Sequence, residues 1–178
     1  MRLRCIYPAV LLLGFSAGAL GQWSDRGHGR VQMNGQVQES ACSLHTDDVW
    51  QEIVFAPQAT RDMYSDASAP EKDFSLRLVN CELEKQNGSR WQGVVVTFDG
   101  KQDETNDALF ALEGEAEGLA LQLTDASGQR AVSGNALNAI SLREGDNQLN
   151  YHLRLVRNGQ PLKEGGWSAA LRFMVAYE

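Results

Sequence analysis

Residues 165–178, GGWSAALRFMVAYE, end the chain on a strand-like pattern. From Leu171 to Tyr177 every second residue is apolar, which is the period of a β-strand with one buried face. A last strand has no following hairpin partner, so at the edge of a sheet it would need cover from another polypeptide. Cover by an internal neighbour from the same chain is the alternative.

Most other apolar stretches alternate in the same way. The predicted strands lie at residues 30–41, 74–79, 94–98, 119–123 and 149–155, with shorter ones at 53–55 and 140–142. Turn signals rich in glycine separate them at residues 87–89, 99–100, 127–128, 144–147 and 158–159. Residues 56–72 include Pro57 and Pro70 and are interpreted as a loop with room for one helical turn. Repeated short strands between turns predict an all-β antiparallel sandwich.

The first 21 residues have the pattern of a secretory signal peptide. Two arginines precede an apolar run at residues 9–15, and small residues lead to a cleavage site after Gly21. The apolar run is too short to span a bilayer, so we expect export without direct membrane insertion. We expect residues 22–39 to form an N-terminal extension and residues 40–178 to form one domain.

The cysteines indicate a disulfide rather than a metal site. Cys5 lies in the signal peptide, which leaves Cys42 and Cys81 as an even pair in an exported protein. Such a pair predicts a disulfide. Neither cysteine belongs to a CxxC motif, and the three histidines are scattered, so we expect no metal and no cofactor. These histidines are His28, His45 and His152.

Composition and motifs argue against an enzyme or a nucleic-acid-binding protein. The net charge of −7 repels a phosphate backbone. The sequence contains no Gly-x-Ser-x-Gly motif and no phosphate-binding glycine loop. The acidic doublets Asp47-Asp48 and Asp103-Glu104 could act as acid, base or calcium ligands, but solvated turns are the commoner role of exposed acids.

The region after the signal peptide combines a flexible arm with a strand pattern. Residues 22–29 are polar and contain glycine, and they lead into alternating positions that begin at Val31. A strand on such an arm can add to the exposed sheet edge of another protein. An ordinary first strand of the sandwich explains the same pattern.

An ordered set of motifs resembles the chaperone–usher pilins. A cysteine follows the N-terminal alternating strand, an Asn-Cys pair closes the strand at residues 74–81, Gly165 is fourteenth from the end, and Tyr177 is penultimate. Further segments that match the family in order are residues 96–100, 118–125 and 149–151. The stretches at residues 48–51, 70–78 and 153–159 are most similar to the termination, or anchor, subunit of P-type pili.

This resemblance implies an incomplete immunoglobulin-like antiparallel sandwich, which lacks its last strand and leaves a groove open beside the C-terminal strand. A periplasmic chaperone would lend a strand to the groove, while its basic residues hold the carboxylate of Glu178. The implied groove edge consists of Gly165, Leu171, Phe173, Val175, Tyr177 and Glu178. The implied donor strand presents Val31, Met33, Gly35 and Val37 to the next pilin. Glu39 departs from the apolar pattern of that strand.

The resemblance implies a minor subunit that terminates pilus growth and anchors the pilus base at the outer-membrane usher. Its partners would be the periplasmic chaperone, the usher and the major rod pilin, and it would pass through the periplasm into the fimbrium. A one-domain adaptor or tip pilin involved in adhesion is the alternative, in which tryptophan rings could stack on sugars. The tryptophans are Trp23, Trp50, Trp91 and Trp167.

Overall fold

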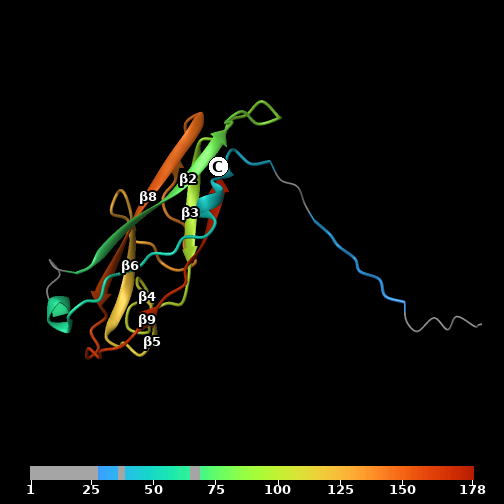
Figure 1. Ribbon diagram of the computed structural model, residues 1–178. Helices are drawn as coiled ribbons and strands as arrows, with labels where there is room; N and C mark the ends of the chain where they lie inside the picture. The colour runs from blue at the N-terminus through green and yellow to red at the C-terminus, as the bar shows by residue number, and fades with distance from the viewer. Residues whose placement is uncertain (1–27, 36–38, 65–68) are drawn as a thin grey trace, which may run out of the picture. The chain divides into compact units, whose positions relative to one another are not determined.

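The computed structural model describes residues 28–35, 39–64 and 69–178 (Figure 1). The predicted signal peptide and Val37 lie outside the described residues. The chain divides into two units, Met1–Val37 and Gln38–Glu178. In the first unit, residues 28–35 have no regular secondary structure, and Val31 and Met33 are 82% and 87% exposed. The strand expected from residue 30 onward is therefore absent from residues 30–35, because the backbone of a strand needs a hydrogen-bonding partner.

The second unit is built from antiparallel β-sheets (Figure 1). The larger sheet has the order β1-β2-β8-β6-β4, with β1 at Ser43–Leu44, β2 at Glu71–Cys81, β8 at Gly145–Arg157, β6 at Leu119–Asp125 and β4 at Phe110–Ala111. The smaller sheet has the order β10-β3-β7, with β10 at Arg172–Tyr177, β3 at Gly93–Asp99 and β7 at Ile140–Ser141. A short ribbon pairs β5 at Glu113–Gly114 with β9 at Trp167–Ser168, and two 3-10 turns, η1 and η2, lie at Thr46–Asp48 and Thr60–Tyr64. The predicted all-β fold is confirmed.

Aromatic side chains join the two main sheets. Phe74 on β2 lies opposite Tyr151 on β8, so both rings point to the same face of the larger sheet. Phe98 on β3 meets the Tyr151 ring edge-on, with ring centroids 4.9 Å apart, and also contacts the Phe74 ring. These contacts place the apolar core between the sheets, as the two-residue period of the strands requires.

The five long predicted strands between residues 74 and 177 are confirmed as β2, β3, β6, β8 and β10, and the short one at residues 140–142 is confirmed as β7. The strand predicted at residues 53–55 is wrong, because residues 51–59 have no regular secondary structure. Ile53 and Phe55 nevertheless pack against the core, so the alternation at these positions reflects burial without a hydrogen-bonded ladder. The loop predicted at residues 56–72 contains η2, and β2 begins at Glu71.

The predicted disulfide between Cys42 and Cys81 is present, and it joins the end of β2 to the residue before β1. A register shift interrupts β2 between Leu78 and Cys81, and Asn80 there has a φ of 53°. Asparagine tolerates this left-handed backbone better than most residues. The Asn80 N–H donates to Asp146 Oδ1 at 3.2 Å, so the Asn-Cys pair marks the point where β2 leaves its ladder.

Asp48 fixes η1 to β2. Its carboxylate is buried and accepts hydrogen bonds from the Arg77 backbone N–H and from the Arg77 guanidinium Nη2, both at 2.7 Å. The Arg77 side-chain hydrogen bond lowers the pKa of Asp48 below its ordinary value of 3.8, against the opposing effect of burial. A lowered folded-state pKa gives stability that is present above the unfolded pKa and is lost as the pH falls through the folded pKa.

Asp48→Asn is expected to reduce the free energy of unfolding by about 2 kcal/mol near neutral pH, because a buried charged hydrogen-bond set is lost. Denaturant unfolding of the full chain checks this value. The difference from wild type should shrink as the pH is lowered below about 4, where the unfolded carboxyl becomes protonated. Asp47→Asn is the matched control, since the Asp47 side chain is 74% exposed and its removal should cost less than about 0.5 kcal/mol. Equal losses in both variants would contradict this assignment.

Candidate functional site

The C-terminal strand β10 is the edge strand of the smaller sheet. It pairs with β3 along its whole length, from Arg172 opposite Asp99 to Tyr177 opposite Val94. Among the described residues no strand pairs with its other side. That side presents a row of backbone N–H and C=O groups on which another strand can add.

The inner face of β10 is incompletely buried. On β3, the inward residues Val94, Val96 and Phe98 are at most 2% exposed. On β10, the side chains opposite them on the same face are only half-buried, although they also pack against the core: Phe173, Val175 and Tyr177. The two strands differ because, within residues 28–35, 39–64 and 69–178, β3 has a neighbouring strand on both sides and β10 has one. The core is therefore less covered along β10 by this part of the chain.

A groove with a volume of about 1030 Å³ lies beside β10. We call it the β10 groove. Its apolar lining comes from both sheets and includes Phe74, Leu76, Phe98, Leu121, Leu153, Leu155 and Phe173. Two segments outside the two main sheets, residues 48–60 and 162–171, complete the lining. The groove is therefore an extension of the core that opens to the surface.

The end of β10 at Tyr177 is bound to the disulfide corner. The Tyr177 hydroxyl donates to the backbone carbonyl of Cys42 at 3.2 Å, and its ring meets Trp91 with centroids 6.0 Å apart. Burial raises the pKa of Tyr177, so the hydroxyl keeps its proton and remains a donor. The Glu178 carbonyl accepts from the Gln92 and Gly93 backbone N–H groups at 2.6 and 3.2 Å.

At the opposite end of the strand, Gly165 allows a close approach of two backbones. A Cβ at this position would lie 2.7 Å from the Ala116 nitrogen and 2.6 Å from the Glu115 Cβ, closer than real atoms come. Two residues later, the Trp167 ring meets Phe55, with centroids 5.4 Å apart and an angle of 55° between the rings. Residues 48–60 and 162–171 therefore meet at this end of the β10 groove.

Of the residues predicted as the groove edge, Gly165, Leu171 and Phe173 line the groove. Val175, Tyr177 and Glu178 follow on the same C-terminal segment but do not line it. Their role as a strand-accepting edge stays a prediction. The residues predicted as the donor strand lie in the other unit. A Cβ added to Gly35 would meet nothing within 4 Å, so no contact among the described residues requires glycine there. The Glu39 carboxylate accepts a hydrogen bond from the Gln86 N–H at 2.8 Å, which places Glu39 on the second unit.

Sequence reasoning missed the part that residues 48–60 play in the groove. The alternation of Ile53 and Phe55 indicates that these side chains are partly buried, but it was interpreted as a strand. The interpretation of the acidic doublets as solvated turns is wrong for one member of each, because Asp48 and Asp103 are buried. Arg77 binds Asp48, while Thr105 and Asn158 bind Asp103. A cluster of Glu71, Asp73 and His152 was also missed, because 79 residues separate Asp73 from His152 in the chain.

These features define a class of protein: an incomplete immunoglobulin-like sandwich, one strand short beside β10, with an apolar groove that can accept a strand. Comparison with known proteins gives the particular family. No protein-family model matches the chain. The chain is 43% identical to the PRS fimbrial minor pilin protein and 42% identical to the PAP fimbrial minor pilin protein, both of Escherichia coli, over 152 residues that cover 84% of this chain and 77% of each relative.

Two solved structures share the fold. The P pilus rod subunit PapA superposes with a TM-score of 0.68 at 23% identity, covering 78% of this chain and 100% of PapA. A chaperone–usher pilus structure superposes with a TM-score of 0.69 at 25% identity, covering 86% of this chain and 98% of the pilus chain.

The chain belongs to the chaperone–usher fimbrial pilin family. It is a fimbrial subunit and not an enzyme, as expected from the motifs. Among the described residues, no helix is long and apolar enough to cross a membrane.

Proposed function

We propose that this protein is the minor pilin that terminates growth of a fimbrium and anchors its base at the outer-membrane usher. The observation that carries the proposal is the difference in similarity: 43% identity to a fimbrial minor pilin against 23% to the rod subunit PapA. A subunit that diverges from the rod while it keeps the pilin fold suits a role that differs from rod extension. Its partners are the periplasmic chaperone, the usher and the major rod pilin, and its path runs through the periplasm to the pilus base.

In this role the chain donates its own strand to the last rod subunit. The donor positions are Val31, Met33, Gly35 and Val37. The exposure of Val31 and Met33 supports the assignment, because neither side chain is buried against the described part of the chain. Each apolar side chain that enters a partner's groove contributes about 1.5–3 kcal/mol in area terms. Register matters equally, since a slip of one residue turns the apolar set outward.

The β10 groove receives a chaperone strand along Leu171, Phe173, Val175 and Tyr177, while basic chaperone residues hold the Glu178 carboxylate. A terminator must keep this strand and refuse the donor strand of another subunit. Two features support refusal: Phe55 packs against Trp167 at the Gly165 end of the groove, and Ile53 packs against the core. In this proposal, these side chains lie where a second donor strand would begin to insert.

In vitro strand exchange tests the proposal. The chaperone-bound full chain is mixed with an excess of donor peptide, and a chaperone-bound rod subunit serves as the positive control. We expect the peptide to displace the chaperone from the rod subunit and to leave it on this chain. Phe55→Ala should make the chain accept the peptide faster. Rapid displacement of the chaperone from the wild-type chain would rule out a terminator.

The alternative is a one-domain adaptor or tip pilin, and the 86% exposure of Trp50 favours it, because an exposed ring can bind a receptor sugar. Deletion of the gene separates the two roles. Loss of a terminator gives overlong pili that are shed easily, whereas loss of an adaptor removes the tip and leaves rod length unchanged.

A further inference from the structure

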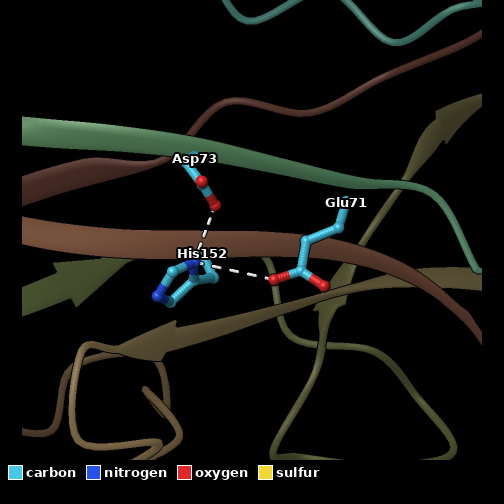
Figure 2. A group of neighbouring side chains, drawn as sticks. All are labelled: Glu71, Asp73 and His152. Atoms are coloured by element: carbon cyan, nitrogen blue, oxygen red, sulfur yellow. Dashed lines mark hydrogen bonds and ion pairs between the residues drawn. The ribbon is translucent and has the colours of Figure 1, made fainter.

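Three side chains that can bind a metal ion gather on the larger sheet, outside the β10 groove (Figure 2). Glu71 and Asp73 come from β2 and His152 from β8. Asp73 and His152 are directly opposite each other in the antiparallel ladder. Glu71 lies two residues before Asp73, on the same face of β2, because side chains alternate along a strand. The backbone pairing of two long strands thus holds all three residues in place.

The donor atoms already point toward one another. His152 Nδ1 lies 2.7 Å from Asp73 Oδ1 and 3.6 Å from Glu71 Oε1, and all three donor atoms lie within 4.8 Å of one another. Around a tetrahedral ion with bonds of 2.0–2.2 Å, neighbouring donor atoms are about 3.3–3.6 Å apart. The distance between His152 Nδ1 and Glu71 Oε1 fits this range. The His152–Asp73 and Glu71–Asp73 distances need only rotations of the two carboxylates, and the Asp73 and Glu71 side chains are 77% and 51% exposed.

The charge balance favours a cation. Two carboxylates face one imidazole, so a neutral ring leaves two negative charges together and a protonated ring leaves one. Across the sheet from His152, the next residue in the row is the uncharged Thr124. The nearest cation by register is Arg154, opposite Glu71. A divalent ion would neutralise both carboxylates at once.

We propose that Glu71, Asp73 and His152 form a surface site for a divalent transition-metal ion, with Zn²⁺ as the best match. One imidazole nitrogen and two carboxylate oxygens suit zinc, whereas calcium and magnesium take oxygen ligands. His152 binds through Nδ1 as a neutral ring with its proton on Nε2, and it gives up its hydrogen bond to Asp73. Water completes the coordination, since the site is open. The bound ion links β2 to β8, the two strands whose inner faces line the β10 groove.

Calorimetric titration of Zn²⁺ into the full chain, purified without a polyhistidine tag and with its chaperone, tests the site. We expect the wild type to bind one equivalent more than His152→Ala, and the double variant Glu71→Gln with Asp73→Asn to lose the same equivalent. The double variant keeps the imidazole and the shapes of both acidic side chains. Its loss of the same equivalent would therefore show that the result with His152→Ala is not caused by misfolding. His28→Ala is the matched control and should titrate like the wild type. Ca²⁺ should give no difference between wild type and variants.

A second readout is the melting temperature, which a ligand raises when it binds the folded state only. Zn²⁺ should raise the melting temperature of the wild type and of His28→Ala, and should lose this effect in His152→Ala. Equal zinc binding by wild type and His152→Ala would overturn the proposal and leave a hydrogen-bonded surface cluster. Because binding is measured directly, either outcome is independent of whether the chain terminates pili.

Discussion

Val175→Asp is expected to abolish binding of a complementing strand to the β10 groove, whereas Met174→Asp, one residue away, is expected to leave it intact. Val175 lies opposite the buried Val96 and faces inward, while Met174 lies opposite Thr97 and is 62% exposed. An added strand would bury the new carboxylate at position 175 but not at 174. The lost apolar contact and the charge desolvation together amount to at least about 4 kcal/mol, a weakening of roughly a thousandfold.

Co-purification with the periplasmic chaperone measures this effect. The Val175→Asp chain should be recovered without chaperone, while the Met174→Asp chain should be recovered with as much chaperone as the wild type. Val175→Ala provides a graded step, since it removes apolar area without adding charge and should weaken the complex by an intermediate amount. Equal recovery of chaperone with all three variants would show that β10 does not receive the strand.

Replacing both Cys42 and Cys81 by serine is expected to cost about 4 kcal/mol of folding free energy, because the bond closes a loop of roughly 40 residues in the unfolded chain. That loss is a large fraction of the 5–15 kcal/mol that typically stabilises a domain. The replacement also frees Cys42, just before β1, from the end of β2. The Cys42 carbonyl is the group that accepts the hydrogen bond from the Tyr177 hydroxyl at the end of β10.

Denaturant unfolding of the chaperone-free chain, with and without a reducing agent, checks the magnitude. The reduced wild type should unfold at the same denaturant concentration as the double serine variant, and both should unfold well below the oxidised wild type. If the oxidised wild type and the double variant unfold together, the disulfide adds no stability and its role is confined to the geometry of the corner.

The interpretation of the irregular segments shows where sequence reasoning was too coarse. The alternation of Ile53 and Phe55 correctly marks two side chains that pack on the core, but a period of two does not require a ladder. The strands β1, β4, β5 and β9 are two residues each, too short to produce any period. Glycine at position 165 was noted as a resemblance, and the structure supplies its reason in the close approach of residues 115 and 116.

The amino-acid sequence by itself determined the all-β class, the long strands and the cysteine pair, because strand period, turn residues and paired cysteines are local or countable properties. Only the tertiary structure decided which of the described strands are neighbours. It showed that none of them pairs with the other side of β10 and that the inner residues of β10 are half-buried. It also brought Arg77 to Asp48 and His152 to Asp73. The physical reason is that the alternation of apolar and polar residues shows which side of a strand is apolar. The order of strands in a sheet depends on contacts between residues far apart in the chain.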